Sequence, residues 1–146
     1  AVKSPKFLSS LINKIGSQSI SVLIQTKKFK NNWEVMTESG RNRSNIELFS
    51  WISKIQEIGI GEIFILFIDD DGKKNTELDC EIVNKISINS KVPVLVGGGI
   101  DNYCKIKKLY KLGIDGCVIS RSLHFNEINI KDIKSNLIKS KFKLRF

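Results

Sequence analysis

Histidine, cysteine and long apolar runs are scarce in this 146-residue chain, and each scarcity argues against a class of protein. The single histidine, His124, argues against a zinc site, which draws on several His and Cys ligands. The three cysteines, Cys80, Cys104 and Cys117, are odd in number and lack CxxC spacing, as is typical of structural thiols in a reducing compartment. No run of roughly 18 apolar residues occurs, so we expect a cytoplasmic protein without a transmembrane helix.

Acidic residues are few relative to basic ones, with 15 Asp and Glu against 24 Lys and Arg and a formal net charge of +9. Such an excess can indicate a nucleic-acid partner. The lysines, however, are spread over every segment, and no interleaved aromatic motif accompanies them, so nucleic acid is not favoured. The joint abundance of Lys, Asn and Ile is typical of an AT-rich genome, and attraction of an anionic substrate is the alternative explanation.

Strand-like and helix-like segments alternate along the chain. A leading helix is expected from Pro5 to Gly16, since proline favours a first helical turn and glycine an end. Ser44 or Asn45 is the expected cap of the second helix, which Gly59 ends. The remaining expected elements are helices over residues 79–88, 103–113 and 130–138, strands over 20–24, 63–68, 92–96 and 116–119, and a short extended piece over 33–37 within a long loop.

The resulting order is one helix followed by four strand–helix units, which predicts an α/β fold with a parallel sheet and right-handed crossovers. A (β/α)₈ barrel needs eight such units and about 250 residues. The sequence therefore predicts a single domain over residues 1–146 with half the content of a barrel, and its four parallel strands leave two unpaired edges.

Chemistry in parallel barrels collects where strands end. The four expected strand ends are Gln25–Lys28, Asp69–Gly72, Gly97–Gly99 and Ser120–Ser122. The glycine run paired with Ser120 and Arg121 favours a phosphate cradle of main-chain amides, although a tight turn without ligand stays open. Arg121 could bind a phosphate with two hydrogen bonds or lie on the surface.

The acidic strand end, Asp69–Gly72, places three carboxylates in sequence. Mutual repulsion predicts a raised pKa for at least one of them if it is buried, which would suit a general acid or base. A solvated loop that caps the next helix is the alternative. An EF-hand calcium loop is not supported, because Lys73 and Lys74 follow and no closing Glu is present. Lys27 and Lys28 could draw an anion to this edge, and His124 beside Phe125 is expected to be a packed structural residue.

With these segments in order, the chain resembles the C-terminal half of the cyclase subunit of imidazole glycerol phosphate synthase over nearly its whole length. The matching stretches are Gly16-Ser17-Gln18, Trp33-Glu34-Val35, Thr37, Ser39-Gly40-Arg41, Gly59 through Ile63, Ile68-Asp69, Asp71-Gly72, Pro93 through Gly99, His124-Phe125 and Glu127-Ile128.

The resemblance implies a lyase of histidine biosynthesis on a (β/α)₈ barrel of the ribulose-phosphate-binding type, in a heterodimer with a glutaminase subunit that supplies ammonia. It implies a small phosphorylated substrate and no cofactor or metal. Carried over by position, one substrate phosphate would lie on Asp71, Gly72, Gly98, Gly99, Ser120 and Arg121. Glu62 would lie at the end of the barrel that receives ammonia and faces the glutaminase.

Three departures from the family pattern affect the expected activity. One of the two catalytic aspartates belongs to a strand outside this chain, and the position of the other holds Gln25, whose amide cannot exchange a proton as a carboxylate does. Asp69 remains as a candidate catalytic carboxylate. Arg121 stands where the family has a small serine.

The leading hypothesis is therefore a divergent or truncated cyclase half that is inactive as a lone chain and requires an N-terminal half-barrel. Three alternatives remain: a relative that makes amidino groups on sugars for surface polysaccharides, a non-catalytic phosphate-binding scaffold that forms a homodimer through its open edges, and a nucleic-acid binder.

Overall fold

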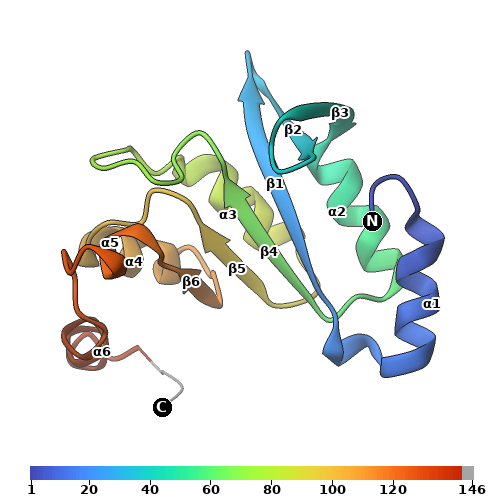
Figure 1. Ribbon diagram of the computed structural model, residues 1–146. Helices are drawn as coiled ribbons and strands as arrows, with labels where there is room; N and C mark the ends of the chain where they lie inside the picture. Colours follow the sequence, from blue (N-terminus) through green and yellow to red (C-terminus); the bar gives the residue numbers. More distant parts are fainter. Residues whose placement is uncertain (143–146) are drawn as a thin grey trace.

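A computed structural model describes residues 1–142 of the chain, and its centre is a six-stranded sheet with the order β3-β2-β1-β4-β5-β6 (Figure 1). The strands are β1 (Ser21–Phe29), β2 (Asn32–Thr37), β3 (Asn42–Glu47), β4 (Glu62–Phe67), β5 (Val94–Gly97) and β6 (Gly116–Val118). The helices are α1 (Pro5–Ile15), the 3₁₀ turn η1 (Ser17–Ser19), α2 (Leu48–Ile58), α3 (Cys80–Asn89), α4 (Tyr103–Lys111), α5 (Arg121–His124) and α6 (Ile130–Lys139).

The four strands β1, β4, β5 and β6 are parallel neighbours in chain order. Helices α2, α3 and α4 connect them, so the predicted α/β half-barrel with a leading helix is confirmed. The helix predictions for residues 79–88, 103–113 and 130–138 are confirmed to within one or two residues, and Gly59 ends α2 in a left-handed conformation.

The segment after β1 differs from the sequence prediction. The strand predicted to end at Ile24 continues to Phe29, turns, and pairs antiparallel with β2, which itself pairs with β3. The prediction that Ser44 or Asn45 caps α2 was wrong, because both residues belong to β3. The side chain of Glu47 caps α2 instead, accepting a hydrogen bond of 2.8 Å from the main-chain N–H of Ser50.

Side-chain hydrogen bonds explain why Ser44 and Asn45 form a strand. Asn45 has a left-handed φ of +57° at an irregularity in the β2–β3 pairing, and its main-chain N–H donates to Glu34 Oε1 at 2.7 Å. The Ser44 hydroxyl donates to the carbonyl oxygen of Val35 at 2.6 Å. Ser44 and Asn45 are therefore both bonded to β2.

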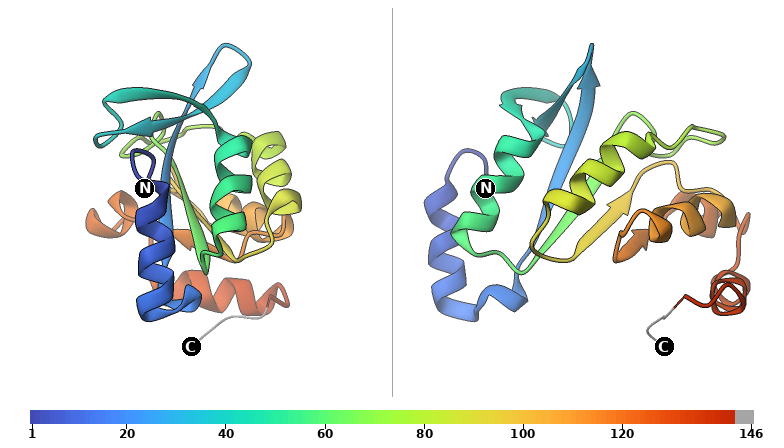
Figure 2. Two further views of the ribbon diagram at one scale, coloured as in Figure 1. Left: turned by 90° about the vertical axis from the view of Figure 1, so that its right-hand side faces the viewer. Right: turned by 180° about the vertical axis from the view of Figure 1, so that it is seen from behind.

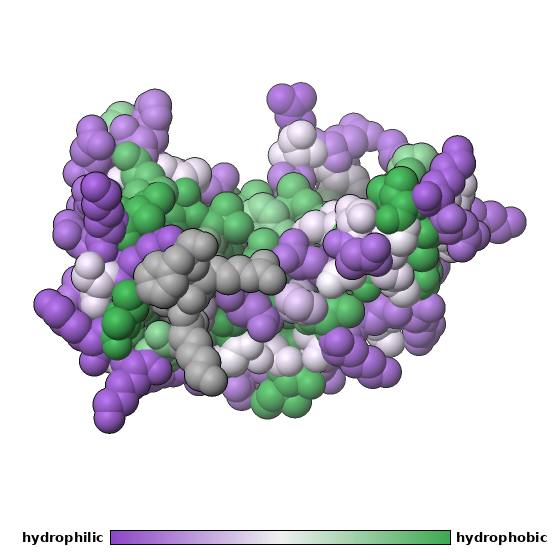
Figure 3. All heavy atoms as spheres, turned by 90° about the horizontal axis from the view of Figure 1, so that it is seen from below, coloured by the Kyte–Doolittle hydropathy of each residue, from purple (hydrophilic) through white to green (hydrophobic). Residues whose placement is uncertain are grey.

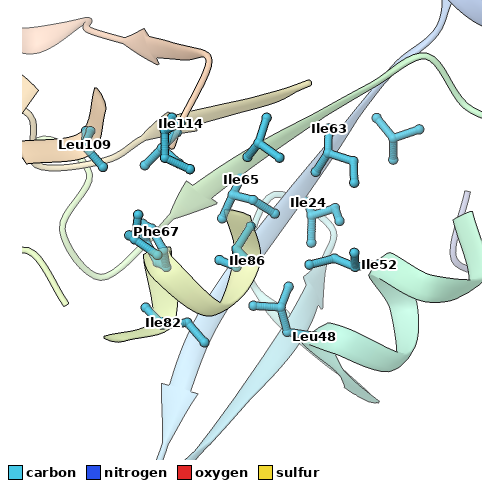
Figure 4. Close-up of a cluster of buried hydrophobic side chains, with 14 of the residues drawn as sticks. Ile24, Leu48, Ile52, Ile63, Ile65, Phe67, Ile82, Ile86, Leu109 and Ile114 are labelled. Carbon is cyan, nitrogen blue, oxygen red and sulfur yellow. The ribbon is translucent and has the colours of Figure 1, made fainter. Parts of the chain in front are cut away.

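The hydrophobic core lies on one side of the sheet, between the strands and the connecting helices (Figure 2). Alternate residues of β1 and β4, such as Ile24, Ile63 and Ile65, contribute to this core with exposures of 1%, 0% and 0%. They share one buried cluster with Leu48 and Ile52 of α2 (Figure 4). The apolar stripes predicted for the helices therefore cover this side of the sheet.

The opposite side of the sheet, here called the inner face, carries no helix among the described residues (Figure 2). The strand register places two rows of residues across it: Leu23, Phe64, Leu95 and Gly116 in one, and Gln25, Leu66, Gly97 and Val118 in the other. Leu23 is half-exposed (50%), and the other large apolar residues of these rows are partly buried: Phe64, Leu66, Leu95 and Val118. Inward-pointing side chains of this kind fill the interior of a (β/α)₈ barrel, so this face corresponds to half of a barrel interior.

Two mutations should show that the two faces of the sheet contribute differently to stability. Ile24→Ala removes a side chain that is 1% exposed and should lower the free energy of unfolding by about 2–5 kcal/mol. Leu23→Ala changes the adjacent inner-face residue and should cost less than about 1 kcal/mol in the isolated chain. Urea unfolding of both variants measures this difference, and equal losses would contradict the assignment of the inner face.

Candidate functional site

Segments from all four parallel strands approach one another where the C-terminal ends of the strands meet, here called the carboxyl edge of the sheet. The prediction that β1 ends at Gln25–Lys28 was wrong, because these residues lie within the strand. Gln25 nevertheless pairs with Leu66 of β4, one residue before the last residue of that strand, Phe67. The last residues of β1 thus extend beyond the carboxyl edge, while Gln25 lies on the inner face at the level of this edge.

The acidic loop, residues 68–79 between β4 and α3, is held against β1 by two ion pairs. Lys27 Nζ lies 2.8 Å from Asp69 Oδ1 and Lys28 Nζ lies 3.0 Å from Asp79 Oδ2. Asp79 is also the N-cap of α3 and accepts a hydrogen bond from the main-chain N–H of Ile82. Lys27 and Lys28 therefore bind carboxylates of the chain itself.

One carboxylate of the acidic loop has the raised pKa that the sequence predicted. Burial raises the pKa of Asp70, and the neighbouring charge of Asp69 adds to this effect. Lys73 and Lys105 oppose the rise. Asp70 therefore holds its proton more readily than an ordinary aspartate.

The glycine turn, residues 97–100, lies against the acidic loop. A Cβ on Gly99 would fall 2.9 Å from Asp70 Cβ and would also collide with the hydroxyl of Thr76, while one on Gly98 would collide with the main-chain oxygen of Phe67. Both glycines have a left-handed φ, of +99° for Gly98 and +66° for Gly99. The close approach that excludes a side chain here is therefore made by the protein itself, which is the tight-turn alternative of the sequence analysis.

Main-chain amides at this turn remain available to an anion. No main-chain carbonyl within residues 1–142 accepts a hydrogen bond from the N–H groups of Gly98, Gly99 or Ser120. The Ser122 hydroxyl donates to the carbonyl oxygen of Ile100 at 3.3 Å, which joins the segment after β6 to the turn after β5. The two glycine-bearing strand ends singled out in the sequence are thus adjacent in space.

Arg121 is already paired in the structure. Its Nη1 donates to Glu127 Oε2 at 2.8 Å, and its guanidinium lies 5.0 Å from the ring centre of Phe125. Lys74 of the acidic loop contacts the other oxygen of Glu127 at 2.5 Å. Glu127 therefore bridges the loop after β4 and the segment after β6.

The remaining predicted residues lie further from this meeting point. Asp71 and Gly72 are exposed in the acidic loop, and Gly72 has open space around it. His124 is exposed with its ring against Phe125, so the expectation of a packed histidine was wrong. Among residues 1–142, no group of three or more His, Cys, Asp and Glu side chains is arranged to hold a metal ion.

Glu62 lies at the opposite end of the sheet, as the first residue of β4. It lines a cavity of about 720 Å³ together with Leu95, Cys117 of β6 and Leu137 of α6. Burial raises the pKa of the Cys117 thiol to about 12, so this thiol is neutral.

Figure 3 views the molecule from below and shows apolar residues exposed between polar ones. No helix of the part that the structure describes has the length and apolarity needed to cross a membrane.

Sheet order, helix placement and the loops at the carboxyl edge define the class of the protein as a half of a parallel β/α barrel. The chain belongs to the histidine biosynthesis protein family, whose sequence profile matches residues 1–129.

Relatives of known name support this assignment. The imidazole glycerol phosphate synthase subunit HisF of Prochlorococcus marinus (strain NATL1A) is 36% identical over 149 residues, which cover 99% of this chain and 58% of the relative. HisF of Natranaerobius thermophilus is 33% identical over 138 residues, covering 94% and 55%, and HisF of Flavobacterium psychrophilum is 32% identical over 146 residues, covering 99% and 58%. The chain therefore spans a little over half the length of these relatives.

The bridge through Glu127 predicts a pH-dependent contribution to stability. Hydrogen bonds from Lys74 and Arg121 lower the pKa of Glu127 below its ordinary value of 4.5. A lowered native pKa stabilises the fold above the ordinary value and loses this effect as the pH falls through the native pKa. Glu127→Gln should therefore lower the melting temperature at pH 7, and the difference between the two proteins should shrink as the pH falls below 4.5.

A matched control is Glu81→Gln, because Glu81 pairs with Lys85 at 2.6 Å but its side chain is 78% exposed. An exposed pair of this kind contributes little, so this variant should melt like the wild type. A constant difference between wild type and Glu127→Gln from about pH 7 to about pH 3 would contradict the role of the carboxylate charge.

Proposed function

We propose that this chain forms one half of the cyclase barrel of imidazole glycerol phosphate synthase and holds one phosphate of the bis-phosphorylated substrate. The observation that carries the proposal is the junction of Gly98, Gly99 and Ser120, where main-chain amides without carbonyl partners among residues 1–142 are adjacent at the carboxyl edge. Main-chain N–H groups at the ends of the last two barrel strands are a common phosphate site.

Side chains around this junction would complete the phosphate site. Arg121 would contribute a charged contact after exchanging Glu127 for the phosphate, because both anions compete for one guanidinium. Asp71 and Gly72 would approach through a movement of the exposed part of the acidic loop. Asp69 would serve as the remaining catalytic carboxylate, held in place by its ion pair with Lys27.

The proposed activity requires partners. The uncovered inner face and the outer edge of β6 would bind a complementary half-barrel, since half-exposed Leu23 and the partly buried Phe64 and Leu95 match the interior of a barrel. A glutaminase subunit would dock at the end of the barrel that carries Glu62 and deliver ammonia there. The complete assembly would close the imidazole ring, with turnover limited by Gln25.

The test is reconstitution. The isolated chain, supplied with substrate and ammonia, should form no imidazole glycerol phosphate, whereas the chain mixed with the N-terminal half of a HisF relative should form a heterodimer. Turnover by the isolated chain would overturn the requirement for a second half. A titration of the isolated chain with inorganic phosphate, followed by amide NMR, should shift the signals of Gly98, Gly99 and Ser120, and unshifted signals would overturn the phosphate site.

A second candidate function is a phosphate-binding scaffold without catalysis. Gln25 favours it, because an amide on the inner face at the carboxyl edge can orient a ligand but cannot exchange protons with it. A completed barrel that binds phosphate, yet stays inactive both as the wild type and as the Gln25→Asp variant, would support the scaffold over the cyclase.

A further inference from the structure

The ammonium group of Lys105, in the first turn of α4, is surrounded by three acceptors. Its Nζ lies 2.8 Å from the carbonyl oxygen of Gly99, 2.9 Å from Asp101 Oδ1 and 3.3 Å from the hydroxyl of Thr76. A lysine ammonium carries three N–H donors, so these acceptors account for all of them. The Lys105 side chain is 13% exposed.

Asp101 ties the same group to the acidic loop from the other side. Its Oδ2 accepts a hydrogen bond of 2.7 Å from the main-chain N–H of Asn75, and its side chain is 9% exposed. Burial works to raise the pKa of Asp101, but the hydrogen bonds from Lys105 and Asn75 outweigh it and lower the pKa. Asp101 therefore carries its negative charge at neutral pH.

These contacts connect two segments that are 23 or more residues apart in the chain. Thr76 and Asn75 belong to the acidic loop, whereas Gly99 and Asp101 flank the end of the glycine turn. The Lys105–Asp101 pair thus links the acidic loop to the glycine turn. It also fixes the carbonyl of Gly99, whose own N–H has no carbonyl partner among residues 1–142.

Stability alone gives a weak reason for such a pair. Burying two charges costs desolvation free energy, and an apolar pair of similar volume often stabilises a fold as well or better. The chain contains a matched pair without this burial, because Lys85 and Glu81 have the same four-residue separation on α3 with side chains 56% and 78% exposed.

We infer that Lys105 is a positioning residue for the phosphate site: it fixes the glycine turn against the acidic loop through Gly99, Thr76 and Asp101. The inference rests on the proposed function for its ligand. Because all three N–H donors of Lys105 are occupied, it acts through the turn and does not contact the phosphate itself.

The test compares Lys105→Met with Lys105→Arg and with the surface control Lys85→Met, using inorganic phosphate as the ligand and amide NMR as the readout. Lys105→Met keeps the apolar stem but removes the charge, and should weaken phosphate binding about tenfold, as expected for loss of one charged hydrogen bond. Lys105→Arg should bind within about threefold of wild type, since it restores the charged donors. Lys85→Met should bind like wild type.

A milder variant covers the case in which Lys105→Met does not fold. Thr76→Val keeps the ion pair and the side-chain shape but removes one acceptor, and should weaken phosphate binding about threefold. Wild-type affinity in both Thr76→Val and a folded Lys105→Met would overturn the inference.

Amide exchange separates this inference from the proposed function. If wild type binds no phosphate, the proposed function fails, yet faster exchange of the Asn75 amide in Lys105→Met or Thr76→Val would still support the positioning role. Unchanged exchange of this amide in every folded variant would overturn the positioning role by itself.

Discussion

Gln25→Asp should raise the turnover of the completed barrel by about 100-fold or more, because a positioned general acid or base contributes roughly 10²–10⁴ in rate. Gln25 lies on the inner face at the carboxyl edge, level with Leu66, and its side chain is only partly buried. A carboxylate at this position would be able to accept and return a proton, which the amide cannot do. The measurement is the steady-state rate of imidazole glycerol phosphate formation with saturating ammonia.

The matched control is Gln25→Asn, which has the length of aspartate and the chemistry of glutamine. It should leave turnover at the wild-type level, so that an increase confined to aspartate identifies proton transfer as the missing step. The affinity of both variants for inorganic phosphate should equal that of wild type, because Gln25 is not one of the proposed phosphate residues. Equal turnover of the aspartate and asparagine variants would contradict the cyclase proposal and favour the scaffold.

Gly98→Ala should destabilise the chain by about 2–5 kcal/mol, since it combines backbone strain with a collision. Gly98 has a φ of +99°, and its added Cβ would meet the main-chain oxygen of Phe67, which cannot move without shifting the end of β4. The same substitution should abolish phosphate binding, because the amide of Gly98 would have to move with the turn. Urea unfolding and phosphate titration measure the two effects.

Gly72→Ala serves as the control for backbone strain without a collision. Gly72 has a φ of +72°, but nothing lies within 4 Å of an added Cβ. Its cost should be about 1 kcal/mol, the ordinary penalty of a left-handed alanine. Similar losses for the two variants would show that the contact with Phe67 is unimportant.

The parallel half of the fold could be predicted from the sequence because apolar periodicity marks each of its elements. The run Ile63–Ile68 is apolar on both faces and is bounded by Glu62 and Asp69, so its place in a covered parallel sheet followed directly. Strand β3 could not be predicted in this way. Its residues Arg43, Ser44 and Asn45 are polar, and hydrogen bonds that involve side chains of β2 and β3 hold it in place.

The candidate site was predictable at the level of segments but less so at the level of contacts. Parallel topology brings the ends of β4, β5 and β6 to one edge, which placed the acidic loop, the glycine turn and Ser120 together. Lys105 gave no signal, because in the sequence it is one of several lysines on α4 and only the structure distinguishes it from Lys107 or Lys108. Arg121 was correctly marked as a residue of the edge, but its engagement by Glu127 depends on the turn after α5.

The short last strand of the sheet has a consequence for how ligand binding and order are linked. β6 has three residues and, within residues 1–142, pairs only with β5, whereas β4 has parallel neighbours on both sides. Edge segments with few partners fray at a lower free energy than central ones. Ser120 follows β6 almost at once, so an anion bound between Ser120 and the glycine turn would hold β6 against β5. Anion binding would then stabilise the pairing of β6 with β5, and any change that stabilises this pairing would in turn raise the affinity for the anion.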